Sequence, residues 1–223
     1  MSDLGRMSAV FFDMDGTLID SETLTEPTIV AFCNEMGVRN VDMDFTQFFG
    51  GPWSKVERAL IDSYPQMEGE TNISARLQEM YHDLLRSRQP PEIPGSRQAL
   101  VAISKLMPVA IVTSSGRDSA AETVRRLEID DNLAFYLGFE DYENGKPEPD
   151  GYLKAAEILQ VEPKNCLVFE DSIPGIQAAK TAGMTVVAIT HRCADIEAAT
   201  GLANMAIRDY SELGEDFYDA ISH

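Results

Sequence analysis

The sequence contains little cysteine and little histidine. Among 223 residues there are three of each. Cys33, Cys166 and Cys193 form neither an even set nor a C-x-x-C motif, which argues against a disulfide framework and against a zinc site. The histidines are scattered and none adjoins a candidate nucleophile, so the sequence does not favour a histidine-based mechanism. Unpaired cysteines fit a reducing compartment, and we expect a cytoplasmic protein.

Positive charge is also scarce. The 37 Asp and Glu residues outnumber the 18 Lys and Arg residues, and the formal net charge is -19 at pH 7. A field of this sign repels polyanions, which argues against nucleic acid and anionic membranes as partners. No apolar run is long enough to span a bilayer, and the start MSDLGRMSAV lacks the basic region and long apolar core of a signal peptide. We therefore expect no nucleic-acid or membrane partner, and an anionic substrate would have to be attracted locally.

From residue 96 onward, helical and strand-like patterns alternate. Strand-like apolar runs fall at residues 109–112, 135–139, 167–169 and 186–189. Amphipathic helical patterns lie between them. This alternation predicts an α/β fold with a Rossmann-like parallel sheet covered by helices on both faces. In such folds, functional sites lie beyond the carboxyl ends of the strands.

A block of about seventy residues before this region has only helical periodicity. It starts near Ile19 to Ser21 and ends at the segment Gln89 to Gly95, in which three prolines stiffen the chain and prevent a helix. The block therefore reads as an insertion. We expect a core domain of residues 1–18 and 92–223, and an inserted α-helical cap domain of residues 19–91 joined to the core by two hinges.

The chemistry is predicted to centre on the stretch from Val10 to Leu18, with the sequence VFFDMDGTL. Its apolar start indicates a buried strand, and side chains alternate along a strand, so Asp13 and Asp15 point the same way at its end. Gly16 allows a sharp turn after them. Two neighbouring carboxylates repel unless a proton or a cation lies between them, and a hard cation such as Mg²⁺ prefers oxygen ligands. Taken alone, the motif could also be a strand that ends in a solvated acidic turn.

Two later segments could hold a phosphoryl group. The strand at 109–112 is followed by Thr113, Ser114 and Ser115, whose hydroxyls and backbone amides could seat phosphate oxygens, although a simple helix-capping turn would look the same. The segment Gly145 to Asp150 then places Lys146 between residues that restrict the backbone. This predicts a positioned cation rather than a freely solvated one.

A third segment could supply further metal ligands. Glu170 and Asp171 follow the strand at 167–169, and either carboxylate could bind the cation; the alternative is a helix N-cap, which Asp171 and Ser172 also suit. Each signal is modest, but all of them occur in order at strand ends or in loops before helices.

With these motifs the sequence resembles the haloacid dehalogenase superfamily of phosphotransferases. The matches are D-x-D-G-T at Asp13 to Thr17, the strand-end Thr113, the lysine loop, and the acidic pair. The loop G-K-P-x-P-D and the later E-D-S-x-x-G-I-x-A-A are similar to the subfamily that includes phosphoglycolate phosphatase and β-phosphoglucomutase. That subfamily has a helical cap inserted after the first strand.

The resemblance implies a mechanism with assigned roles. Asp13 would attack phosphorus and form an aspartyl-phosphate, and Asp15 would act as general acid and then as general base. Thr113 and Lys146 would hold the transferring oxygens. Mg²⁺ would be the cofactor, and substrate contacts would come from the core and the cap. The residues that bind the metal would be Asp13, the Asp15 carbonyl and Asp171, with Glu170 in the second shell or bound through water. The residues that bind the substrate would be Thr17, Ser114, Ser115, Gly50 and Trp53.

The leading prediction is a Mg²⁺-dependent phosphatase, a monomer that acts on a small phosphorylated metabolite such as a sugar phosphate. The alternative is a β-phosphoglucomutase-like hexose-phosphate mutase. Mutases of the group typically carry a valine where this chain has Thr17, and an arginine of the cap where this chain has Trp53. Both departures favour the phosphatase. A phosphoaccepting signalling domain is a third reading, against which the helical insertion and Asp15 both count.

Overall fold

A computed structural model describes residues 5–222, which divide into two compact units. Of the described residues, unit 1 comprises 5–20 and 92–222, and unit 2 comprises Ser21–Pro91. The predicted boundary lies after residue 18, whereas Ile19 and Asp20 belong to unit 1, because Ile19 forms β-bridges with Asp15 and Glu92. That unit 2 acts as a cap stays a prediction.

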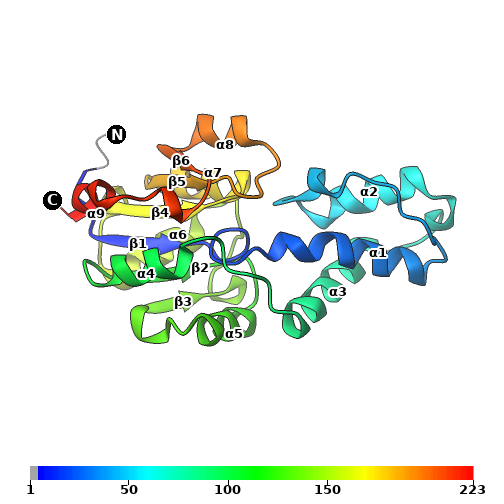
Figure 1. Ribbon diagram of the computed structural model, residues 1–223, viewed down its shortest axis with the longest axis horizontal. Helices are drawn as coiled ribbons and strands as arrows, with labels where there is room; N and C mark the ends of the chain where they lie inside the picture. Colours follow the sequence, from blue (N-terminus) through cyan, green and yellow to red (C-terminus); the bar gives the residue numbers. More distant parts are fainter. Residues whose placement is uncertain (1–4, 223) are drawn as a thin grey trace. The chain divides into compact units, whose positions relative to one another are not determined.

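Unit 1 is built on a six-stranded parallel sheet in the order β3-β2-β1-β4-β5-β6 (Figure 1). The predicted α/β fold with a parallel sheet is confirmed, and β6 is a strand that the sequence patterns did not predict. The strands are β1 Ala9–Phe12, β2 Val109–Val112, β3 Phe135–Leu137, β4 Cys166–Glu170, β5 Thr185–Ile189 and β6 Met205–Ile207.

Helices cover both faces of this sheet. Because side chains alternate across a strand, β1 buries Phe11 on one face and Phe12 on the other. Phe11 belongs to a buried cluster with Tyr152 of helix α6. On the opposite face, the rings of Phe12 and Phe169 stack with centroids 4.8 Å apart, and Phe169 lies 6.0 Å from Phe217 of helix α9. The helices of unit 1 are α4 Ser96–Ser104, α5 Arg117–Leu127, α6 Asp150–Leu159, α7 Ile173–Thr181, α8 Ile196–Leu202 and α9 Glu215–Ser222, with 3-10 helices at Asp130–Asn132, Phe139–Asp141, Pro163–Asn165 and Tyr210–Glu212.

Unit 2 is built from helices that enclose a core of their own. Its helices are α1 Thr25–Glu35, α2 Trp53–Ser63 and α3 Ile73–Ser87, with 3-10 helices at Ser21–Leu24, Phe45–Phe48 and Pro65–Met67. Phe32, Leu60 and Leu77, one from each long helix, are fully buried in one cluster. Across the described residues of both units, no helix is both long and apolar enough to cross a membrane.

Candidate active site

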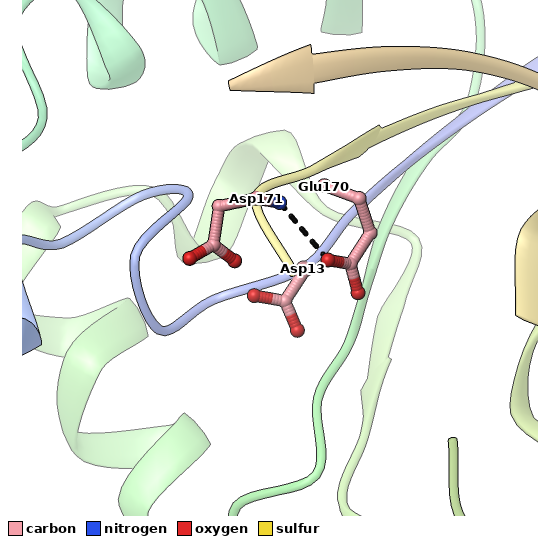
Figure 2. A group of neighbouring side chains, drawn as sticks. All are labelled: Asp13, Glu170 and Asp171. Carbon is pink, nitrogen blue, oxygen red and sulfur yellow. Dashed lines mark hydrogen bonds between the residues drawn. The ribbon is translucent and has the colours of Figure 1, made fainter. Parts of the chain in front are cut away.

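Three carboxylates gather at the carboxyl ends of two neighbouring strands. Asp13 follows β1, Glu170 is the last residue of β4, and Asp171 comes next. Because β1 and β4 are parallel and paired, with Phe12 opposite Phe169, their carboxyl ends lie at the same edge of the sheet. The three residues are buried, and one oxygen of each lies within 4.8 Å of the others (Figure 2). This is the edge at which the sequence predicts the site.

Lys146 bridges two of these carboxylates. Its Nζ lies 2.5 Å from Asp13 Oδ1 and 2.6 Å from Glu170 Oε1, and it also donates to the carbonyl of Val112 at 3.3 Å. The side chains of Lys146 and Asp13 are each 8% exposed and that of Glu170 is fully buried. Burial alone would lower the pKa of Lys146, but the two carboxylates raise it well above its ordinary value. The ammonium group therefore stays charged.

Glu170 is saturated by protein donors. Its Oε1 accepts hydrogen bonds from Lys146 Nζ and the Tyr152 hydroxyl, and its Oε2 accepts from the amides of Asp171 and Ser172 and from Ser172 Oγ, at 2.6–3.1 Å. These donors leave its lone pairs engaged within the protein. Glu170 is thus placed to hold Lys146 and the Asp171 loop.

Two glycines make room for the acidic residues. A Cβ at residue 175 would lie 1.7 Å from Glu170 Oε1, so only glycine fits beside this carboxylate. A Cβ at residue 16 would lie 2.0 Å from Asp171 Oδ2, and the φ of Gly16 is +78°. The glycines of the D-x-D-G and E-D-S-x-x-G motifs therefore have a steric reason.

Asp15 is held by the hydroxyls that follow β2. Ser115 Oγ donates to Asp15 Oδ2 at 2.6 Å and Thr113 Oγ1 lies 3.5 Å from the same oxygen. The Ser115 amide donates in turn to Thr113 Oγ1 at 3.0 Å. The other oxygen, Asp15 Oδ1, is buried and has no hydrogen-bond partner among the described residues. One oxygen of Asp15 is thus fixed while the other is unengaged.

Other predicted residues lie in different surroundings. Thr17 is fully buried, and its Oγ1 donates to Asp171 Oδ1 at 3.3 Å. Its hydroxyl therefore contacts an acidic residue of the cluster. Ser114, which lies between Thr113 and Ser115 in the chain, is exposed. Gly50 and Trp53 belong to unit 2.

Within unit 2, Gly50 and Trp53, the first residue of α2, are tied to neighbouring elements. The Gly50 amide donates to Glu22 Oε1 at 2.7 Å, and the rings of Trp53 and Tyr81 meet edge to face with centroids 5.4 Å apart. These contacts hold the loop at the start of α2.

Burial and neighbouring carboxylates raise the pKa of Asp13. The pKa of this carboxyl is raised from 3.8 to about 8. Burial is the largest cause; the ammonium of Lys146 lowers the pKa, whereas Glu170 and Asp15 raise it. A single lysine therefore does not fully compensate for the buried negative charge. A cation at this point would favour the ionised form of Asp13.

The cluster of Asp13, Glu170 and Asp171 could bind a metal ion. The donor set fits a hard divalent cation, since it consists of carboxylate oxygens without sulfur or imidazole. Because the oxygens of Glu170 are taken by protein donors, Asp13 and Asp171 are the residues that would hold the ion.

Tyr152 is a site residue that the sequence patterns assign only to the core. It lies on the apolar face of α6, is 1% exposed, and its hydroxyl donates to Glu170 Oε1 at 3.1 Å. Its ring also faces Lys146, with Nζ 5.2 Å from the ring centroid. No sequence pattern indicates that this buried tyrosine meets a buried acid, so the contact is visible only in the structure.

Fold and site together define an α/β enzyme whose candidate catalytic groups lie at the carboxyl edge of a parallel sheet. The family model of haloacid dehalogenase-like hydrolases matches residues 10–189, and the chain belongs to this family. The predicted family membership is confirmed.

Known relatives agree with this assignment. A phosphorylated carbohydrates phosphatase of Thermotoga maritima is 32% identical over 183 residues, which cover 80% of this chain and 82% of that protein. The β-phosphoglucomutase of Bacillus subtilis is 28% identical over 199 residues, which cover 82% of this chain and 83% of that protein. Among solved structures, a HAD hydrolase of family IA, variant 3, from Entamoeba histolytica has the same fold. Its TM-score is 0.74 at 24% identity, and the match covers 97% of this chain and 100% of that chain.

The raised pKa of Asp13 predicts a pH-dependent loss of stability in the metal-free protein. A carboxyl group whose pKa is higher in the folded state binds its proton more tightly there, so the stability it contributes falls as the pH rises from about 4 to about 8. Asp13→Asn removes this titration while keeping the shape of the side chain. Without metal, we expect the melting temperature of wild type to fall relative to that of Asp13→Asn as the pH rises, with a clearly smaller gap near about pH 5 than near about pH 9.

Added Mg²⁺ should remove most of the difference at the higher pH, because the cation compensates for the ionised carboxylates. Differential scanning calorimetry at both pH values, with and without Mg²⁺, measures these effects. An equal difference between the two proteins at both pH values would contradict the role assigned to Asp13.

Proposed function

We propose that this protein is a Mg²⁺-dependent phosphatase that hydrolyses a small phosphorylated metabolite through an aspartyl-phosphate on Asp13. It is a phosphoric monoester hydrolase of the haloacid dehalogenase family. The observation that carries the proposal is the placement of a buried Asp13 against the Lys146 ammonium, in one small site with Asp15. A sugar phosphate is the favoured substrate, since the relative from T. maritima is named for phosphorylated carbohydrates.

Asp13 is the proposed nucleophile. One of its carboxylate oxygens would form a bond to phosphorus while the bond from phosphorus to the leaving oxygen breaks. Lys146, 2.5 Å from Asp13 Oδ1, would keep the carboxylate oriented and offset negative charge that builds up on the transferring oxygens. Thr113 and Ser114 would hold the other phosphoryl oxygens.

Asp15 is the proposed general acid and base. Its unengaged Oδ1 would give a proton to the leaving oxygen and later take one from the water that attacks the aspartyl-phosphate. Ser115 holds the other oxygen at 2.6 Å and so fixes the direction of the carboxyl group. Ser115 was predicted to contact the substrate. We propose that it instead supports Asp15 through this hydrogen bond.

Mg²⁺ would be held by Asp13, Asp171 and the Asp15 carbonyl, with Glu170 in support. When bound, the ion supplies positive charge against the carboxylates and the phosphoryl group. Thr17, which donates to Asp171 Oδ1, would keep that carboxylate oriented.

Unit 2 is the proposed cap, in which Gly50 and Trp53 would contact the substrate and help to select it. We also propose a monomer in the cytoplasm. Helix α2 carries two cationic side chains, Lys55 and Arg58, that could replace the arginine of a mutase. The Lys55 ammonium donates to the carbonyl of Gln47 at 2.7 Å, so it is engaged within unit 2, and Arg58 remains as the alternative cation. A mutase needs a cation in the cap for the phosphate that is not reacting, and the indole of Trp53 supplies none. These observations favour hydrolysis over mutase activity.

Asp13→Asn should abolish phosphatase activity without unfolding the protein, because the amide is nearly isosteric but cannot act as the nucleophile. We expect a loss of more than about 10³-fold in kcat with p-nitrophenyl phosphate. The matched control is Asp131→Asn, which changes an exposed carboxylate outside the site and should retain full activity. An Asp13→Asn variant with wild-type circular dichroism and more than about a tenth of wild-type turnover would refute the assignment.

The choice between hydrolase and mutase can be tested with β-glucose 1-phosphate and a trace of glucose 1,6-bisphosphate. Because the start of α2 carries the indole of Trp53 instead of a cation, the aspartyl-phosphate should pass to water, and inorganic phosphate should be released. Enzymatic assay of phosphate and glucose 6-phosphate in the same sample gives the answer. Stoichiometric conversion to glucose 6-phosphate would establish the mutase.

A further inference from the structure

Asp15 lies on a short turn whose far end is Asp20. The Gly16 amide donates to the carbonyl of Ile19 at 2.8 Å, and the Leu18 amide donates to the carbonyl of Met14 at 2.8 Å. Asp15 and Ile19 also form a β-bridge. The backbone of Asp15 is therefore coupled to the position of the chain where it leaves the turn.

Asp20 is bound by an arginine from the loop after β5, which is separated from β1 by β4 in the sheet. Arg192 follows β5, 172 residues away, and its Nε lies 3.2 Å from Asp20 Oδ1 and 3.1 Å from Oδ2, while its Nη2 lies 3.1 Å from Oδ2. The Asp20 side chain is 5% exposed and that of Arg192 is 41% exposed. His191 adds a weaker contact, with Nε2 3.6 Å from Asp20 Oδ2. A buried carboxylate is thus held by a forked, charge-assisted contact.

We propose that Arg192 is a positioning residue for the general acid. Through Asp20 it fixes the end of the turn from Gly16 to Asp20, and through that turn it holds the Asp15 carboxyl group at the angle that proton donation requires. The inference rests on the proposed role of Asp15, because Arg192 would act on it through Asp20 and the turn. It extends the site to the loop after β5.

The chemistry of the arginine side chain matters for this role. Its planar guanidinium engages both oxygens of Asp20 and so restricts the rotation of that carboxylate. A lysine at the same place would keep the charge but contact Asp20 as a point charge. Arg192→Lys should therefore preserve part of the effect and separate geometry from charge.

A leaving-group comparison distinguishes misplacement of Asp15 from general damage. Phenyl phosphate and p-nitrophenyl phosphate have nearly the same shape, but phenolate is the more basic leaving group and depends more on proton donation. The value of kcat/KM for these esters reports the steps up to loss of the leaving group. A variant that only loses folded protein lowers both values equally, whereas a misplaced general acid lowers the phenyl phosphate value more.

The experiment measures kcat/KM for both esters in the 223-residue chain with Mg²⁺. Asp15→Asn serves as the reference for loss of the acid, and Lys164→Ala, which breaks an exposed ion pair with Glu162, is the matched control. We expect Arg192→Ala to lower the phenyl phosphate value at least about tenfold more than the p-nitrophenyl phosphate value, in the same direction as Asp15→Asn. Arg192→Lys should give an intermediate ratio, and Lys164→Ala an unchanged one.

Equal losses on both esters in Arg192→Ala, or no loss, would overturn the positioning role while leaving the phosphatase assignment intact. If Arg192→Ala does not fold, the ratio in Arg192→Lys decides in the same way. If wild type hydrolyses neither ester, the proposed function itself fails. If Asp15→Asn leaves the ratio unchanged, the general acid has been assigned wrongly, and the role of Arg192 is overturned with it.

Discussion

The site depends on a buried lysine between two buried carboxylates. Lys146 contacts Asp13 at 2.5 Å and Glu170 at 2.6 Å in surroundings that water hardly reaches. Breaking a buried ion pair by removing one partner typically costs roughly 3–5 kcal/mol, because it leaves an uncompensated charge. Glu170 is in turn satisfied by Tyr152, so the nucleophile, the cation and the supporting acid form one connected network. The glycines beside the acidic residues follow from the same constraint, since any side chain there would displace a carboxylate of the network.

Much of the site could be predicted from the sequence, because a parallel sheet brings its strand ends to one edge. Asp13, Lys146 and Asp171 are distant in sequence, yet each follows a strand or precedes a helix, and the alternation of elements indicates how the strands assemble. The helical character of residues 21–91 was also readable, from their period and the prolines that follow. The start of unit 2 at Ser21 instead of residue 19 has a local cause. Ile19 pairs with Glu92 by a β-bridge, and helical periodicity carries no information about such pairing.

Contacts between side chains could not be predicted in the same way. Tyr152 lies on an apolar helix face and looks like core, while its hydroxyl meets Glu170. Thr17 reads as a substrate contact of the motif, yet it is buried against Asp171. Arg192 belongs to no motif, and its pairing with Asp20 depends on how the loop after β5 is directed, which residue patterns do not record. In each case the residue type was visible, but its partner was set by tertiary packing.

The central claim is that the phosphoryl group passes through Asp13. The most direct measurement mixes enzyme, Mg²⁺ and substrate, quenches with acid during turnover, reduces the acyl-phosphate with borohydride, and sequences the peptide that contains Asp13 and Asp15 by tandem mass spectrometry. The account predicts conversion of Asp13 to homoserine, with Asp15 unmodified and no conversion without substrate. Rapid release of phosphate with Asp13 unmodified at every quench time, or modification of another residue instead, would contradict it.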